Sequence, residues 1–296
     1  LTGVDFTNTN LSTLDLSTKD LTGAIFTNSN LATTNLTNAN LTNAIFTNTV
    51  LTTTNLVGAN LTGVNLTGKN LSGKDLTGVN FTNTNLTNVN LSGANLNGAI
   101  FTGANLTGTN LSNISLVGAD LRGIDISKFN FKKKDLTGIN LSGQDLRKIK
   151  FEESILVNAN LSKTNISNIS FEKQNLSGIN LSESIAGNSK FEKCNLTGAN
   201  LSLSNFDNAK FEGANLTNAI MNNSSFINAK FEKATLIGAN ISSSNLNQSK
   251  FEEAKLNNAN LLGSSILQAK FEKAILTGAK WTDGRTCGAN SIGSCK

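Results

Sequence analysis

Large apolar side chains recur at every fifth position along almost the whole chain. Position 1 and each fifth residue after it, through Trp281, carries Leu or Phe in most cases and Ile or Met in the others, with Ala186 as the one small exception. The residue two places before each of these sites is usually small, and the residue directly before it is mostly Asn or Asp. A helix repeats about every 3.6 residues and a strand about every 2, so neither matches a period of five.

A backbone that turns a corner every five residues brings each bulky side chain to the same axis, and four corners close a square. Gly or Asn stands two places after many of the apolar sites, for example at Gly3, Asn8 and Gly23. Both residue types accept the positive φ of a tight turn. The pattern therefore predicts an all-β solenoid of about 14 coils of twenty residues, stacked at about 4.8 Å. It covers residues 1–283, and a non-repeat tail follows at 284–296.

The repeated A-N-L-T-G pattern resembles the pentapeptide-repeat proteins, a family of tandem A-(D/N)-L-x-x units, from residue 1 to about 283. The resemblance implies a right-handed quadrilateral β-helix, and the handedness comes from the resemblance alone. Similar W-T-D-G-x-x-C tails end other bacterial members of the family. By that likeness, Trp281 is expected to cover the last coil as part of a terminal cap.

The triplet Lys-Phe-Glu recurs every twenty residues in the second half of the chain, and all copies fall on one side of the square. We expect an inward aromatic column there, formed by Phe131, Phe151, Phe171, Phe191, Phe211, Phe231, Phe251 and Phe271. Outside it we expect a carboxylate ladder of Glu152, Glu172, Glu192, Glu212, Glu232, Glu252 and Glu272. A column of lysines lies beside that ladder, at Lys150, Lys190, Lys210, Lys230, Lys250 and Lys270.

This charged side has two interpretations. It is a docking strip, or it is a solvated face on which columns of opposite charge relieve repulsion and keep the coils in register. The second is favoured, because exposed ion pairs contribute only about 0–1 kcal/mol each and charged runs usually face water. Gly is missing from several of its corners, at Lys173, Lys193 and Glu253, so we expect this side to turn without positive φ.

The first half of the chain has uncharged Thr ladders in place of the charged columns. One consists of Thr7, Thr27, Thr47, Thr67, Thr87 and Thr107, and an adjoining one of Thr2, Thr22, Thr42, Thr62, Thr82 and Thr102. Such arrays could order water or contact a flat surface, although Thr is also simply a good β-residue. Between the halves, Phe129 puts a large ring at a position that is normally small, so we expect a local widening and not a domain boundary.

Composition argues against catalysis. The chain contains no His, no Tyr and no Pro, and its Ser and Thr residues have no adjacent base, so no triad, zinc site or cofactor site is expected. We expect no small-molecule substrate and no membrane span, because no apolar run approaches roughly 18 residues. The net charge of +5 is spread among interleaved Lys and Glu and the aromatic rings point inward, so nucleic acid binding is not expected either.

The three cysteines divide into one core residue and one terminal pair. Cys194 takes an inward small position, where an inert buried thiol is favoured. Cys287 and Cys295 lie in the tail and are either a disulfide, which we favour, or two free thiols. A disulfide indicates an oxidising location, periplasmic, secreted or at the cell surface, and free thiols indicate the cytoplasm.

These observations favour a non-enzymatic structural or scaffold rod that binds a protein partner or itself. Leu1 begins in register without a capping segment, so we expect end-to-end association into dimers or filaments, unless a preceding segment or signal peptide has been removed. One alternative follows from the resemblance to the pentapeptide-repeat family, whose best-known members mimic DNA and bind gyrase. The net positive charge of this chain makes gyrase binding the weaker interpretation. Ice or surface binding by the Thr ladders is the remote alternative.

Overall fold

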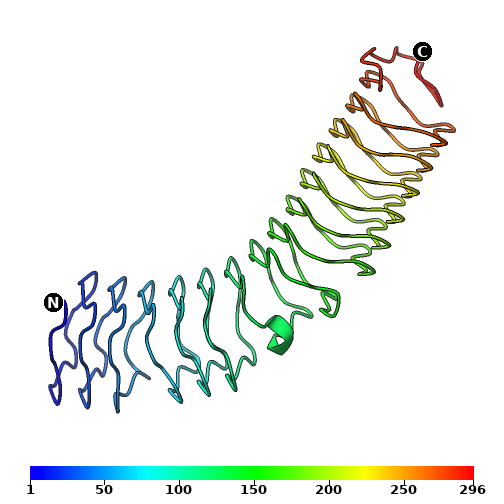
Figure 1. The fold of residues 1–296 in the computed structure, drawn as a ribbon. Helices are drawn as coiled ribbons and strands as arrows, with labels where there is room; N and C mark the ends of the chain where they lie inside the picture. The colour runs from blue at the N-terminus through cyan, green and yellow to red at the C-terminus, as the bar shows by residue number, and fades with distance from the viewer. The chain divides into compact units, whose positions relative to one another are not determined.

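The computed structural model describes residues 1–296, with the exception of the side chain of Lys128. The backbone winds in coils of twenty residues (Figure 1), and most corners of a coil pair with the next coil through parallel bridges between residues twenty apart. Asn40 pairs with Asn60, and Asn60 pairs in turn with Asn80. The solenoid that the five-residue period predicts is therefore present.

Each pentapeptide consists of one tight turn and one bridging residue. In the turn that begins at Leu21, the N–H of Ala24 donates to the carbonyl oxygen of Leu21 at 3.0 Å, and Gly23 has a φ of +66°. A positive φ at the third turn residue is typical of a type II turn. The following residue, Ile25, bridges to Ile45, and its N–H donates to the carbonyl oxygen of Val4 at 2.9 Å.

The parallel pairing consists of isolated bridges and not of extended strands. A strand needs several consecutive paired residues, whereas here a turn follows every bridge, so pairing cannot extend along the chain. Within the part of the chain that the structure describes, the one helix is η1, a 3-10 helix at Ile126–Lys128. No helix in that part is long and apolar enough to cross a membrane.

The apolar fifth residues form the core. Leu61, Leu66 and Phe81 are fully buried, and small inward residues such as Ala59 fill the space between them. The tight packing follows from the alternation of one large and one small inward residue in each pentapeptide. A narrow shaft filled in this way stabilises each coil mainly through contacts with its two neighbours.

The chain divides into two compact units, unit 1 at Leu1–Asn130 and unit 2 at Phe131–Lys296. This differs from the expectation of one continuous solenoid with a local widening near Phe129. The last bridge of unit 1 joins Ile100 to Asp120, and η1 then takes up the segment before the boundary. The ring of Phe129 is buried at an inward position that carries a small residue in a regular turn. A regular turn has no room for a ring there.

The corners on the charged side keep positive φ even where Gly is absent. Lys173, Lys193 and Glu253 have φ values of 64°, 59° and 60°, so the expectation of a different turn was wrong. The stacked register imposes the same turn on each coil, whatever residue stands there. The left-handed conformation costs a non-Gly residue roughly 1–2 kcal/mol, which the ladder bonds on both sides offset.

Candidate functional site

The aromatic column runs through unit 2. Its eight Phe side chains are buried, and successive ring centroids lie 5.8, 5.9, 5.3, 5.0, 4.9, 4.8 and 4.9 Å apart from Phe131 to Phe271. The rings become more parallel from Phe151 onward, with interplanar angles falling from 24° at Phe151–Phe171 to 2° at Phe251–Phe271. Phe206 and Phe226 stack beside it and meet its rings at steep angles, which widens the aromatic core.

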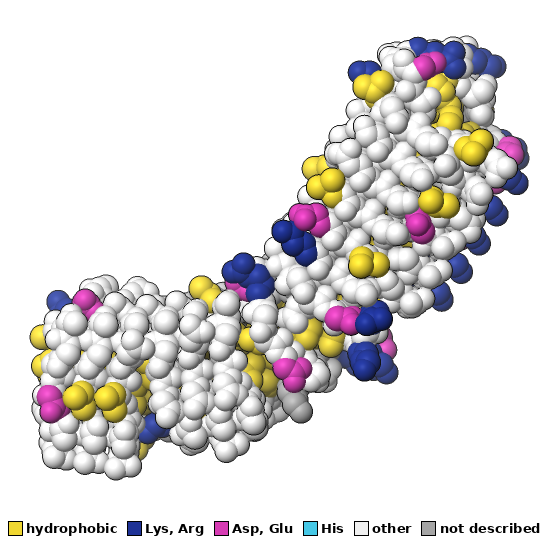
Figure 2. All heavy atoms as spheres, viewed as in Figure 1, with side chains coloured by type: hydrophobic (Ala, Val, Ile, Leu, Met, Phe, Trp, Pro, Cys, Tyr) yellow, Lys and Arg dark blue, Asp and Glu magenta, His cyan; other side chains and the backbone are white. Residues whose placement is uncertain are grey.

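The carboxylate ladder and the lysine column lie outside the aromatic column, and we call them together the charged wall. Lys and Arg side chains follow one edge of unit 2 in Figure 2. Two carboxylates of the ladder form ion pairs, Glu152 with Lys132 at 2.6 Å and Glu172 with Lys190 at 3.6 Å. For the described side chains of the other ladder members, Glu192, Glu212, Glu232, Glu252 and Glu272, no ion pair with a lysine occurs within 4.0 Å.

The middle of the carboxylate ladder is partly desolvated. In Glu192, Glu212, Glu232 and Glu252, the Oε2 atom is buried and has no hydrogen-bond partner among the described residues. Burial raises the pKa of Glu212 above its usual value, and the carboxylates of Glu192 and Glu232 above and below it raise it further. The lysine column therefore neutralises the ladder less than direct pairing would.

The Thr ladders of unit 1 use their hydroxyl groups within the molecule. Thr62 donates through Oγ1 to Oδ1 of Asn60 at 2.6 Å, and the N–H of Thr62 donates to the same oxygen at 3.1 Å. Thr67 repeats both bonds with Asn65. The Asn-x-Thr spacing thus has a structural cause, because Asn closes the corner and Thr holds the amide of Asn in place.

The tail folds back onto the last coil and forms a cap. Ile275 and Lys280 pair with Ile292 and Thr286 in antiparallel bridges. Trp281 lies edge-on to Phe271, with centroids 5.3 Å apart, and so covers the end of the aromatic column.

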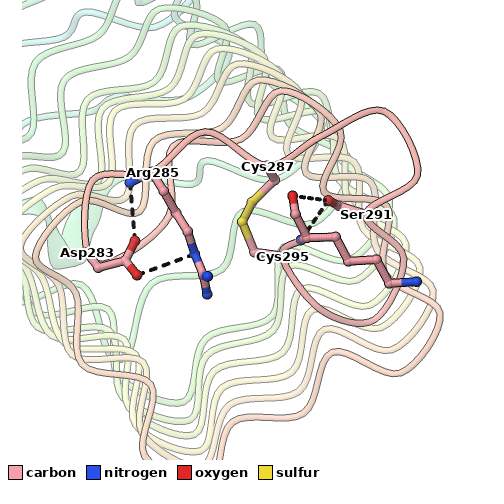
Figure 3. The surroundings of a disulfide bond; sticks show 6 residues. Asp283, Arg285, Cys287, Ser291 and Cys295 are labelled. Atoms are coloured by element: carbon pink, nitrogen blue, oxygen red, sulfur yellow. Dashed lines mark hydrogen bonds and ion pairs between the residues drawn. A yellow bond between two sulfur atoms is a disulfide. The ribbon is translucent and has the colours of Figure 1, made fainter.

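A disulfide joins Cys287 to Cys295 in this cap, next to the Asp283–Arg285 ion pair at 3.3 Å (Figure 3). The chain end is held there as well, because the N–H of Lys296 donates to Oγ of Ser291 at 3.0 Å. Cys287 itself is buried under the fold of the tail.

The repeat assigns the family. The family model described as "Pentapeptide repeats" matches in 8 copies, over residues 1–38, 20–52, 54–93, 84–123, 94–132, 209–248 and 244–280. A second model, "Pentapeptide repeat region", matches residues 145–221. The chain belongs to the pentapeptide-repeat family. The family fold is a right-handed β-helix, which the twenty-residue coils described above fit. No curated protein matches the chain by sequence.

Several solved pentapeptide-repeat structures are similar to this chain. QnrB1, a plasmid-mediated fluoroquinolone resistance protein, is 16% identical over 76% of this chain and 94% of its own, with a TM-score of 0.42. HetL, involved in heterocyst differentiation regulation in the cyanobacterium Nostoc, is 24% identical over 95% of this chain and 92% of its own, with a TM-score of 0.21. Rfr23 from the cyanobacterium Cyanothece is 33% identical over 38% of this chain and 84% of its own, also at 0.21.

Cys194 occupies an inward small position of the pentapeptide-repeat register. The thiol is buried and donates to the carbonyl oxygen of Phe171 at 2.8 Å. Burial raises the pKa of Cys194 to about 12, so the thiol stays protonated at neutral pH. A protonated, buried thiol is a poor nucleophile and a poor metal ligand. Within the described residues, no group of three or more His, Cys, Asp or Glu could hold a metal ion.

Lys69 and Lys74 were missed by the sequence reasoning. Both stand at the inward small position, where most pentapeptides carry Ala, Ser, Thr or Val. They lie half-buried, and burial lowers the pKa of each. The signal was present in the sequence, because a long charged residue at an inward position cannot pack into the shaft and must displace a neighbouring coil.

Proposed function

We propose that the chain is a non-catalytic scaffold and that the charged wall of unit 2 binds a protein partner. The coils supply a rigid surface whose side chains repeat at fixed spacing, which suits recognition more than chemistry. Catalysis would need a reactive group in a pocket, and the buried thiol of Cys194 does not supply one.

One observation carries this proposal. The charged wall presents lysines and carboxylates of which most are not consumed by ion pairs within the chain. For Lys210, Lys230, Lys250 and Lys270, no ion pair within 4.0 Å occurs among the described side chains. A partner with charges in the opposite order could pair with both columns and also relieve the repulsion within the carboxylate ladder. We therefore expect binding to weaken as salt is raised.

Site-specific photo-crosslinking tests the proposal. A photoreactive amino acid at Glu232 should crosslink one discrete partner in the organism's own cells. The product should disappear in the variant Lys210→Ala, Lys230→Ala, Lys250→Ala. The same amino acid at Thr87, on the same Thr ladder of unit 1 and away from every described cavity, is the matched control and should give no such product. Equal crosslinking from both positions, or crosslinking that survives the lysine changes, contradicts the proposal.

The location outside the cytoplasm is part of the proposal and is supported by the pairing of Cys287 with Cys295. Alkylation of intact cells by a thiol reagent that cannot cross membranes, before and after reduction, tests it. We expect Cys287 and Cys295 to be labelled only after reduction of the disulfide.

The other readings of the sequence remain predictions. A scaffold of about 14 coils that associates end to end through the coil beginning at Leu1 would scatter light as dimers or filaments, and a monomer at high concentration would contradict it. Binding to gyrase, as a mimic of DNA, would inhibit supercoiling, which an enzyme assay detects. Surface binding by the Thr ladders is weakened by the engagement of Oγ1 of Thr62 and Thr67 with Asn amides.

A further inference from the structure

Unit 1 contains a break in the pairing of its coils. On the two sides of the break, the N–H of Leu41 donates to the carbonyl oxygen of Asn60 at 2.8 Å, and the N–H of Gly58 donates to that of Thr77 at 2.8 Å. Between them, no backbone hydrogen bond joins residues 46–56 to residues 65–75, both of which the structure describes in full. About half of one coil is thus separated from the next.

Lys69 and Lys74 lie at this separation. From their inward positions they reach back to the preceding coil. Nζ of Lys69 donates to the carbonyl oxygen of Thr49 at 2.6 Å, and Nζ of Lys74 donates to those of Thr52 and Thr54. The carbonyl groups of Thr49 and Thr54, which a continuous ladder would pair with the next coil, accept from lysine side chains instead. The main chain near Phe46 is left unpaired with the next coil.

A cavity of about 550 Å³ lies in the break. It is lined on one side by Ile45, Phe46 and Asn48 and on the other by Asn65, Thr67 and Lys69. Its volume is in the range of small-ligand pockets, roughly 300–1,000 Å³. Lys69 is the one charged residue among those that line it, and Ile45 is exposed beside it.

The main-chain groups on the two sides face each other in the pattern of an interrupted ladder. In the preceding coil, Phe26 and Asn28 donate to the carbonyl oxygens of Ile45 and Thr47, at 2.8 and 3.0 Å. The corresponding N–H groups of Phe46 and Asn48 have no acceptor among the described residues. The carbonyl oxygens of Asn65 and Thr67, which would accept from them, have no donor there either.

We propose that this cavity binds an extended peptide segment of a partner protein, carrying an acidic side chain. The segment lies between the separated coils as an added strand: its carbonyl groups accept from Phe46 and Asn48, and its N–H groups donate to Asn65 and Thr67. Strand addition of this kind uses main-chain bonds for affinity and side-chain contacts for specificity. The carboxylate pairs with the ammonium group of Lys69, and an apolar neighbour contacts Ile45. The site is independent of the charged wall, which lies in unit 2.

A titration with a synthetic peptide tests the proposal. The probe is the acetylated and amidated pentapeptide Ala-Asp-Leu-Thr-Gly, added at up to about 1 mM to the ¹⁵N-labelled protein, because main-chain pairing over one short segment gives weak binding. The amide resonances of Phe46 and Asn48 should shift and saturate, and their hydrogen exchange should slow. A peptide with methylated amide nitrogens, or with Lys in place of Asp, should bind about tenfold more weakly or worse.

Lys69→Ala and Lys19→Ala form the matched pair of variants. Ala at position 69 lets the coils close, so the peptide-induced shifts should disappear while the spectrum stays dispersed. Lys19 stands at the same inward register position but is exposed and lies away from the cavity, so Lys19→Ala should bind as the natural protein does. Unshifted amides at Phe46 and Asn48, equal binding of the methylated peptide, or undiminished binding by Lys69→Ala would each overturn the proposal and leave a cavity that holds only water.

Discussion

Unit 1 and unit 2 use the same turn and the same apolar centres, but their ladders differ in continuity. From Leu176 to Gly263 in unit 2, each apolar centre donates its N–H to the next coil without a break. In unit 1 the ladder is interrupted between residues 46 and 75. The difference lies at the inward small position, which carries mostly Ala or Ser in that part of unit 2 and Lys at 69 and 74 in unit 1.

The same rule operates inside unit 2, at Gln174. Its Nε2 donates to the carbonyl oxygen of Phe151 at 2.8 Å, and the ladder is open there too, because the described N–H groups of Phe151 and Glu153 have no backbone acceptor. By contrast, the short side chains of Ser184 and Ser204 fit. Oγ of Ser204 donates to the carbonyl oxygen of Leu181 at 2.8 Å and accepts the N–H of Ser184 at 3.0 Å. At these two places a long polar side chain at the inward position accompanies an open ladder, whereas the short side chain of Ser leaves the coils paired. The ladder is also open between Leu31 and Val50, where the inward residues are Thr49 and Thr54, so side-chain length is one cause among others.

The largest effect is expected from removing a ring in the middle of the aromatic column. Phe231→Ala leaves a cavity between two parallel rings and should lower the free energy of unfolding of unit 2 by about 3–5 kcal/mol. Hydrogen exchange of unit 2 amides measures the loss. The half-buried Phe6 of unit 1 is the control, and Phe6→Ala should cost clearly less. Similar losses for the two variants would mean that the column adds nothing beyond ordinary burial.

Removing the disulfide is expected to loosen the cap. The double change Cys287→Ser, Cys295→Ser opens a loop with a sequence separation of 8 and should cost about 2–3 kcal/mol. The N–H groups of Leu276 and Gly278, which donate to tail carbonyl oxygens at 2.9 Å, should exchange faster. Cys194→Ala is the control and should leave these two amides unchanged. Unchanged exchange in the double variant would show that the bridges alone hold the tail.

Closing the break should make unit 1 more like unit 2. Lys74→Ala removes a half-buried ammonium group and lets backbone bonds form again, so the free energy of unfolding of unit 1 should rise by about 1–2 kcal/mol. Thermal unfolding followed by amide resonances of unit 1 measures the gain. Lys19→Ala, at an exposed inward position, should change little. A loss of stability in Lys74→Ala would mean that the lysine holds the coils together better than the ladder would.

The smallest effect is a difference in the response of the two units to acid. The pKa values of Asp5, Asp15, Asp20 and Asp75 in unit 1 are lowered, first by hydrogen bonds from Thr or Ser side chains, so their contribution to stability is lost as the pH falls below about 4. The pKa of Glu212 in unit 2 is raised, so the folded state binds the extra proton and stability decreases as the pH rises through that pKa.

Amide hydrogen exchange measured at about pH 5 and about pH 3.5 separates the two responses. The ordinary pKa of a carboxyl group lies between these two pH values. On acidification, amides beside Asp20 of unit 1 should lose protection relative to amides beside Glu212 of unit 2. Amides beside Asp145 and Glu152 of unit 2 should lose protection as well, because the pKa values of these carboxyls are also lowered, first by hydrogen bonds from Arg147 and Lys132. Glu212→Gln should stabilise unit 2 at pH 7 and remove part of the gain beside Glu212 in acid. An equal response beside Asp20 and Glu212, or no gain in Glu212→Gln, would contradict the assignment of a desolvated carboxylate ladder.

The coil and the core were predictable because they depend on a strict period. Counting in fives gives the position of each apolar residue in the core, so Leu61 and Phe231 could be assigned to the core without a structure. The corner at Lys173 could not, because the sequence shows the absence of Gly but not the pressure of two adjacent coils that forces positive φ on Lys. Phe129 marked the segment at which the chain divides into two compact units, but the sequence does not show how far neighbouring coils yield around a large inward ring.

The site residues divide in the same way. The repeat of twenty residues places the Phe, Glu and Lys side chains in their columns. It does not show which Glu pairs with which Lys, because that depends on how far each side chain reaches. The ladder members Glu192, Glu212, Glu232 and Glu252 leave an oxygen buried without a partner. The cavity at Lys69 does not follow from the repeat, because it lies beside a residue that departs from the repeat.

The backbone bonds between coils also have a direction. In the pentapeptide Leu201–Asn205, the N–H groups of Leu201 and Leu203 point to later residues, Ile220 and Asn222, and that of Asn205 points back to Ser184. In each such pentapeptide, two N–H groups point toward the later coil and one points toward the earlier coil. Repeated along the solenoid, this excess leaves a net axial dipole whose positive pole faces the later coils, whereas ordinary sheets have small net dipoles. The tail meets that pole with oxygen atoms, since the carbonyl groups of Arg285, Cys287 and Ser291 accept from the final turns. The cap is therefore an electrostatic terminus as well as a lid.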